Sequence, residues 1–136
     1  MNVFTYGSLM YPAVWERVVR GRYAGAPAVL EGYRRLALHG VDYPGAVPQP
    51  GARIEGRVYL EVGPDDLARL DAFEADDYRR EEVWVHPEGG APVRAQVYVF
   101  VTAAKLAGVD WDAARFEREH LARFVAAHAA AGAFRG

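Results

Sequence analysis

The segment 93–101 alternates so that both sides of one expected strand are apolar. Small and branched residues occupy its odd positions, while Tyr98 and Phe100 occupy even positions. A strand with two apolar faces must be covered on both of them, which requires a closed or covered sheet. Another strand is expected at 79–86, and the turn Glu88-Gly89-Gly90 joins the two as a hairpin.

Strands make up most of the remaining expected structure. We expect them at residues 3–6, at 26–38 as two segments that bend at Gly32, and at 53–62, while the strand described above is expected over 93–102. Helices are expected at 13–20, 64–75 and 112–130. The stretch 40–52 contains three prolines and three glycines, so we expect a loop there that cannot join a central strand. The strands follow one another too closely for a series of βαβ crossovers. The sequence therefore predicts one α+β domain over residues 1–136, a small mixed β-barrel with flanking helices.

Composition excludes several classes of function. The net charge of -2 provides no electrostatic surface for nucleic acid or for an anionic membrane. No apolar run approaches the roughly 20 residues that a membrane span needs. The chain has no cysteine, and its four histidines lack the spacing of metal ligands, so we expect neither a metal nor a cofactor. Because the chain enters a strand at once, without a signal-peptide pattern, we expect a cytoplasmic protein.

The tetrapeptide Tyr6-Gly7-Ser8-Leu9 lies between the first strand and a helix that opens near Pro12. At such a junction several backbone N–H groups have no acceptor within the helix. They point toward the same position, which suits a carboxylate or an oxyanion. Ser8 is the only serine in the chain. An ordinary strand-to-helix turn is the alternative interpretation. Ser8 has no Gly-x-Ser-x-Gly context, so we do not expect a serine triad.

Glu74 is the carboxylate best placed for acid–base chemistry. Leu67, Leu70 and Phe73 form an apolar stripe at helical spacing, and Glu74 projects within about 40° of its centre. Burial raises the pKa of a carboxyl group because desolvation disfavours the charged form, which suits a general base near neutral pH. A glutamate that turns to solvent at the helix end is the alternative. Adjacent carboxylates such as Asp76-Asp77 point apart and are expected on a solvated surface.

Several short segments follow one another in an informative order. They are Tyr6-Gly7-Ser8-Leu9, Tyr43-Pro44-Gly45-Ala46-Val47-Pro48, Gly56-Arg57-Val58-Tyr59, Asp71-Ala72-Phe73-Glu74 with Tyr78 and Arg80 after it, and Gln96-Val97-Tyr98-Val99-Phe100. In order and spacing they resemble the gamma-glutamylcyclotransferase-like family, especially its compact single-domain, AIG2-like members. The resemblance covers about residues 3–102. The Tyr-Gly-Ser-Leu motif alone is weak, but the ordered set makes chance a poor explanation.

The resemblance implies the barrel fold and a reaction, the cyclisation of a γ-glutamyl substrate to 5-oxoproline with release of its amine. In that family a glutamate in the position of Glu74 takes a proton from the α-amino group, which then attacks the γ-carbonyl of the same molecule. No enzyme nucleophile is needed, so Ser8 is implied to donate a hydrogen bond. The turn Tyr6-Gly7-Ser8-Leu9 is implied to hold the glutamyl group. Tyr78 and Tyr98 are implied to be pocket walls and phenol donors, and either fits a core aromatic equally well.

Two other hypotheses fit the same residues. The pocket binds a small carboxylate without turning it over, or the enzyme removes a γ-glutamyl group from a larger amine. A small-molecule γ-glutamyl substrate is the only partner expected, and the sequence predicts no particular oligomeric state. Each catalytic hypothesis requires that the Glu74 carboxylate and the amides of Gly7, Ser8 and Leu9 line one pocket.

Overall fold

The computed structural model describes the backbone of residues 1–131 and the side chains of residues 1–127. The strands in this part of the chain are β1 (Val3–Thr5), β2 (Gly25–Leu38), β3 (Pro44–Tyr59), β4 (Tyr78–Pro87), β5 (Val93–Phe100) and β6 (Leu106–Asp110). The helices are α1 (Pro12–Val18), α2 (Pro64–Glu74), α3 (Ala113–Glu119) and α4 (Leu121–Ala131), with the 3₁₀ turns η1 (Ser8–Met10), η2 (Ala75–Asp77) and η3 (Ala103–Lys105).

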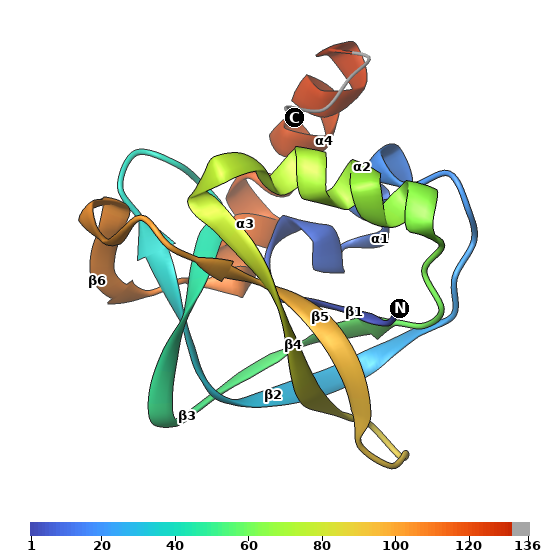
Figure 1. The fold of residues 1–136 in the computed structure, drawn as a ribbon. Coiled ribbons are helices and arrows are strands. Elements are labelled where there is room, and N and C mark those ends of the chain that lie inside the picture. Colours follow the sequence, from blue (N-terminus) through green and yellow to red (C-terminus); the bar gives the residue numbers. More distant parts are fainter. Residues whose placement is uncertain (132–136) are drawn as a thin grey trace.

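Five of these strands close into a barrel (Figure 1). β1 pairs with β3 and with β5, β5 pairs with β4, β4 pairs with β2, and β2 returns to β3. The pairings of β5 with β1 and β3 are parallel and the others in the ring are antiparallel. β6 extends the sheet beyond β2. The predicted mixed β-barrel with flanking helices is confirmed.

The expected loop over 40–52 is wrong for most of its length, because β3 begins at Pro44. This part of β3 pairs with β2, and Ala46 also pairs with β5, so the strand is central. The N–H of Ala46 donates to the Tyr6 hydroxyl at 3.2 Å rather than to β2. Residues two apart in a strand direct their N–H groups to the same side. Pro44 and Pro48 therefore remove no donor from the ladder between β2 and β3.

The two apolar faces expected of β5 are covered by different partners. Ala95, Val97 and Val99 belong to the core inside the barrel. Tyr98 points the other way and belongs to a second core between the barrel and the helices. Val101 lies one residue beyond β5 and is exposed, so it does not extend the inner face. The barrel thus has a filled interior and an outer apolar side that the helices cover.

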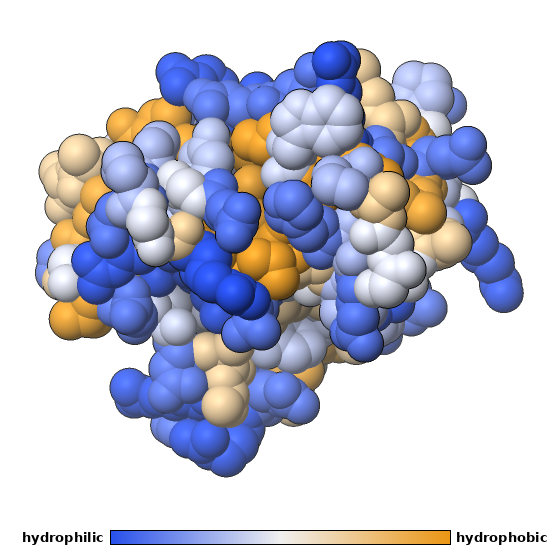
Figure 2. Space-filling model, turned by 90° about the horizontal axis from the view of Figure 1, so that it is seen from below, coloured by the Kyte–Doolittle hydropathy of each residue, from blue (hydrophilic) through white to orange (hydrophobic). Residues whose placement is uncertain are grey.

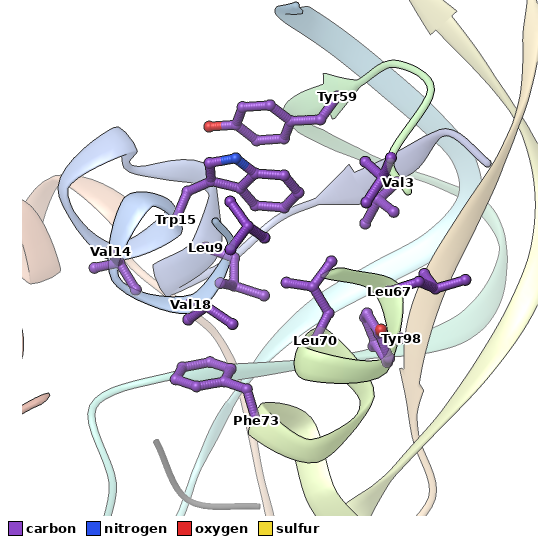
Figure 3. Close-up of a cluster of buried hydrophobic side chains, with 12 residues drawn as sticks. Val3, Leu9, Val14, Trp15, Val18, Tyr59, Leu67, Leu70, Phe73 and Tyr98 are labelled. Atoms are coloured by element: carbon purple, nitrogen blue, oxygen red, sulfur yellow. The ribbon is translucent and has the colours of Figure 1, made fainter. Parts of the chain in front are cut away.

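The helices gather on one side of the barrel, with α1 and α2 over β1 (Figure 1). The stripe expected on α2 is buried, and Figure 3 shows Leu70 and Phe73 beside Val18 of α1. α1 begins at Pro12. Proline has no backbone N–H, but an N–H at this first position would have no acceptor within the helix, so no hydrogen bond is lost. Trp15 from the same helix stacks on Tyr59 of β3, with ring centroids 3.7 Å apart. α1 is therefore fixed between α2 and the barrel wall.

The single helix expected over 112–130 is divided into α3 and α4 at His120, whose φ of -126° is not helical. Asp112 caps α3, because its carboxylate accepts the N–H of Arg115 at 3.0 Å. Phe116 is buried and its ring lies against Phe124 of α4, with centroids 5.7 Å apart. The break lets both helices pack on the same core.

The face of the molecule seen in Figure 2, away from the helices, is mainly hydrophilic. Its small hydrophobic patches are separated by polar side chains, as is usual for a protein surface. Within residues 1–131, no helix has both the length and the apolar character that crossing a membrane requires.

The Asp66 carboxylate, in the first turn of α2, ties this helix to the segment after α1. It accepts hydrogen bonds from the N–H of Arg20 at 2.9 Å, the N–H of Gly21 at 2.8 Å, the Tyr23 hydroxyl at 2.6 Å and Arg69 Nη1 at 2.7 Å. Burial alone would raise the pKa of this carboxyl, but the hydrogen bonds outweigh it and lower the pKa from 3.8 to about 2. A carboxylate also suits the positive end of the helix dipole.

The substitution Asp66→Asn should lower the free energy of unfolding at neutral pH by about 2–3 kcal/mol, since each tenfold change in acidity corresponds to roughly 1.4 kcal/mol. Because the folded-state pKa lies below the unfolded one, this contribution is complete above about pH 4 and is lost as the pH falls toward 2. Urea unfolding over that range measures it. Asp65→Asn, one residue earlier and exposed, is the control and should cost less than about 1 kcal/mol. A difference for Asp66→Asn that persists unchanged at low pH would contradict the role.

Candidate active site

A cavity opens between the end of α2, the turn after β1 and the β3–β5 side of the barrel. Its volume is about 140 Å³, well above the roughly 10–15 Å³ that one water molecule needs, so it can hold a small organic molecule. All seven residues selected from the sequence line it, namely Tyr6, Gly7, Ser8, Leu9, Glu74, Tyr78 and Tyr98. Glu74 lies about 65 residues from the turn in sequence, and the fold brings both to the same cavity.

The turn after β1 is held in place at both ends. Arg35 Nη1 donates to the Tyr6 carbonyl at 2.9 Å and to the Glu55 carbonyl at 3.1 Å. A Cβ atom at Gly7 would lie 2.8 Å from the Pro44 ring, so only glycine fits against β3 at this point. The next residues form η1, and the N–H groups of Ser8 and Leu9 lie in its first turn, where a helix provides no backbone acceptor.

Three tyrosines line the cavity, Tyr6 just after β1, Tyr78 from β4 and Tyr98 from β5, and each hydroxyl proton has a protein acceptor. The Tyr6 hydroxyl donates to the Tyr98 carbonyl at 2.5 Å. The Tyr78 hydroxyl donates to the Pro44 carbonyl at 2.7 Å. The Tyr98 hydroxyl donates to Asp71 Oδ1 at 2.7 Å. The Tyr6 oxygen also accepts the Ala46 N–H, whereas the oxygens of Tyr78 and Tyr98 keep lone pairs for a ligand while their protons hold the ring positions.

The negative charge of Glu74 affects the pKa of all three phenols. Burial raises the pKa of Tyr6, Tyr78 and Tyr98, and the negative charge of Glu74 raises each of them further. Glu74 acts on all three phenols and lines the same cavity as they do. The three phenols stay neutral at physiological pH. Glu74 is half-buried at the last position of α2.

The network behind Tyr98 continues to the edge of the barrel. Arg80 Nε donates to Asp71 Oδ1 at 3.0 Å, and Arg80 Nη1 donates to Gln96 Oε1 at 3.2 Å. Asp71 thus accepts from both a phenol and a guanidinium, which fixes the Tyr98 ring at the cavity wall. Asp71 lies beside the apolar stripe of α2 rather than on it, so helical periodicity gives no sign of this contact.

Several lining residues were not selected from the sequence. They are Phe4, Thr5, Tyr43, Pro44, Phe73, Ala75, Asp77 and Phe124. Asp77 is partly exposed, in keeping with the expected solvated surface, but it also lines the cavity and accepts from Lys105 Nζ at 2.8 Å and Thr102 Oγ1 at 2.6 Å. These two hydrogen bonds lower the pKa of Asp77 and keep it charged. Tyr43 and Pro44 belong to a segment of the family resemblance, which was the available signal.

Among the described residues, no group of three or more histidine, aspartate or glutamate side chains is arranged to hold a metal ion. The cavity instead is lined by the carboxylate residues Glu74 and Asp77, by neutral phenols and by the turn Gly7-Ser8-Leu9. This arrangement suits proton transfer to and from a small carboxylate-bearing or amide-bearing molecule.

A family model described as gamma-glutamyl cyclotransferase, AIG2-like, matches residues 3–113. The chain is similar to Protein AIG2 C of Arabidopsis thaliana, 33% identical over 127 residues that cover 91% of this chain and 76% of that protein. The solution structure of an Arabidopsis thaliana protein aligns with a TM-score of 0.72 at 32% identity, over 96% of this chain and 80% of that chain. A solved gamma-glutamyl cyclotransferase aligns over 74% of this chain and 66% of that chain, with a TM-score of 0.59. At 19% identity, this last likeness shows the fold alone.

The backbone immediately after Glu74 is strained. Ala75 has φ 61° and ψ -155°, a region that essentially only glycine occupies without cost. Its N–H still donates to the Asp71 carbonyl, as the helix end requires. The strained turn ends α2 abruptly, so that Glu74 is its last residue, and it leads directly into η2.

The substitution Ala75→Gly should raise the free energy of unfolding by about 1 kcal/mol, because glycine relieves a strain of roughly 1–3 kcal/mol at some entropic cost in the unfolded chain. Thermal or urea unfolding measures the change. Ala72→Gly, inside the same helix at an exposed position, is the control and should destabilise by about 1 kcal/mol. A loss of stability in both variants would show that Ala75 is not strained.

Proposed function

The chain belongs to the AIG2-like gamma-glutamyl cyclotransferase family, and we propose that it is an enzyme which cyclises a γ-glutamyl amine or peptide to 5-oxoproline. The free amine or amino acid is the second product. The observation that carries this proposal is the presence of Glu74 and the Gly7–Leu9 amides at one cavity, with three neutral phenols around them. In the proposed reaction, Glu74 is the base and the turn binds the negatively charged group of the same substrate molecule.

In the proposed reaction, Glu74 takes a proton from the α-ammonium group of the substrate. The resulting amine attacks the γ-carbonyl carbon of the same molecule, and the carbonyl oxygen becomes an oxyanion. The bond between that carbon and the leaving nitrogen then breaks, and the leaving nitrogen receives a proton from the Glu74 carboxylic acid. Glu74, again a carboxylate, then takes the extra proton from the ring nitrogen and passes it to the released amine, which departs as an ammonium ion, so Glu74 ends the cycle as a carboxylate. The atoms balance without water or an enzyme nucleophile.

The turn after β1 and the phenols have separate roles in this scheme. The N–H groups of Ser8 and Leu9 bind a carboxylate or the developing oxyanion. The oxygen of Tyr98, whose proton is held by Asp71, accepts a hydrogen bond from the substrate ammonium group. Because the reaction is intramolecular, holding the folded-back conformer supplies much of the rate enhancement, with effective molarities that reach about 10⁵–10⁸ M in well-oriented systems.

The purified protein should release 5-oxoproline from at least one member of a panel of γ-glutamyl dipeptides and γ-glutamyl amines, as measured by chromatography. Glu74→Gln keeps the shape of the side chain and removes its basicity, so it should lower kcat by about 10²–10⁴-fold. Substrate binding should change little, which calorimetry with the inactive variant checks.

Glu88→Gln is the matched control, since Glu88 is exposed at the β4–β5 turn and outside the cavity. Its rate should equal that of the unmodified protein. Tight binding of γ-glutamyl compounds without any product would overturn the enzymatic proposal and favour a binding protein on the same fold. A Glu74→Gln variant that retains more than about a tenth of the rate would contradict a general-base role.

Tyr98→Phe should lower kcat/KM by roughly tenfold, the effect of losing one hydrogen bond of about 1.4 kcal/mol. Asp71→Asn should also lower it, because the weaker acceptor holds the ring less firmly, and the double variant should be no worse than Tyr98→Phe alone. Tyr33→Phe, a half-buried phenol outside the cavity, is the control. Additive effects of the two substitutions would show that Asp71 does not act through Tyr98.

A further inference from the structure

A second cavity lies between α1, the segment 19–23 and β3. Its volume is about 480 Å³, and it shares no lining residue with the candidate active site. The proposed reaction makes no use of it. Its lining combines a stacked aromatic pair with three arginines, Arg20, Arg22 and Arg57.

The aromatic pair forms a rigid base for this cavity. The rings of Trp15 and Tyr59 are stacked with an interplanar angle of 3°, and Figure 3 shows the Tyr59 ring lying flat over Trp15. Tyr59 is 4% exposed. The guanidinium carbon of Arg57 lies 5.4 Å from the centroid of the Tyr59 ring. Packing on both faces thus fixes the position of the Tyr59 hydroxyl.

Two buried polar atoms at this base have no hydrogen-bond partner among the described residues, the Tyr59 hydroxyl oxygen and Arg57 Nε. Leaving such groups unpaired is costly, and native structures contain few of them. Burial raises the pKa of the Tyr59 phenol, so the hydroxyl keeps its proton at neutral pH. Arg57 Nε can only donate, and the Tyr59 hydroxyl can donate its proton, so an acceptor oxygen placed between them would serve both groups.

The lining of the cavity carries a net positive charge, as the binding of an anion requires. Three arginines and one glutamate, Glu16, give a formal excess of +2, in a chain whose net charge is -2. Within the described part of the chain, none of the three arginines has a carboxylate at ion-pair distance. Arginine suits oxyanions because its planar fork donates two parallel hydrogen bonds.

We propose that this cavity binds the phosphoryl group of a small phosphorylated molecule, with Arg57 and Tyr59 as its inner donors and Arg20 and Arg22 at its rim. A phosphate monoester carries close to two negative charges at neutral pH, which matches the excess of the lining, whereas a carboxylate carries one. The apolar part of the lining, which comes from Pro12, Trp15 and Val19, accommodates the organic part of the ligand. This proposal does not rest on the proposed function.

Binding requires a movement of the Arg57 side chain, because both inner donors are shielded from solvent. Arg57 is half-buried and has several rotatable bonds, so its guanidinium can turn from the Tyr59 ring toward the cavity. The Tyr59 ring stays in place because Trp15 holds it. The bound oxygens then provide the missing acceptor for both groups.

A titration of the ¹⁵N-labelled protein with phenyl phosphate tests the proposal. The Trp15 indole and Arg57 Nε resonances should shift together, while the Trp84 and Trp111 indoles stay unchanged. Benzoate, which has the same ring and one charge, should bind more weakly, and inorganic phosphate should shift Arg57 without Trp15. Shifts confined to the Gly7, Ser8 and Leu9 amides, or no shift at millimolar phenyl phosphate, would overturn the proposal.

Arg57→Gln should weaken the binding of phenyl phosphate by roughly tenfold or more, the range for a charge-assisted hydrogen bond. Arg53→Gln, at an exposed position four residues earlier on β3, is the matched control and should bind as the unmodified protein does. Equal affinity for these two variants would overturn the role of Arg57 and with it the proposal.

Two more variants guard against a folding defect in Arg57→Gln. Arg20→Gln combined with Arg22→Gln changes only exposed side chains and should also weaken binding several-fold. Tyr59→Phe removes the unpaired hydroxyl, so it should weaken binding by about fivefold without lowering thermal stability. Unchanged affinity in both would overturn the site.

Discussion

The barrel depends on one buried phenol, that of Tyr6. Its hydroxyl donates to the Tyr98 carbonyl on β5 and accepts the Ala46 N–H on β3, so it joins two strands whose own parallel pairing is short. Without that oxygen, a buried carbonyl and a buried N–H would both lose a partner. The next residues are the turn Gly7-Ser8-Leu9. The closure of the barrel and the position of the candidate active site are therefore fixed by the same side chain.

Local patterns were sufficient for the parts of the fold whose burial follows from periodicity. The alternation along 93–101 and the stripe on α2 predicted both the elements and their buried faces. The stretch 40–52 was misjudged because a count of prolines does not reveal which side of a strand loses its donors. That side depends on how β3 lies between β2, its neighbour along the chain, and β5, which lies far away in sequence. The break at His120 has no glycine or proline to mark it, and it follows from the packing of Phe116.

The seven predicted site residues lie at one cavity, and most were found through ordered motifs rather than through periodicity. Glu74 is the exception, since helical spacing alone directed it toward the core. Asp71 belongs to one of the ordered segments, but its contact with Tyr98 was not predictable, nor was that of Asp77 with Lys105, because each contact spans more than 25 residues. The second cavity was equally hidden, since an unpaired buried atom is a property of three-dimensional packing. The roles of all these residues in a reaction stay predictions.

The short strand β1 has a consequence for the order in which the molecule assembles. Val3 pairs with Gln96, 93 residues later, as well as with Tyr59 of β3. Contacts so distant in sequence form late and slow folding, because the loop between them must be ordered first. During synthesis, β1 has no parallel partner until β5 has left the ribosome. The turn that follows β1 thus acquires its final position only when nearly the whole barrel exists, and an unfinished chain carries the binding motif without the site.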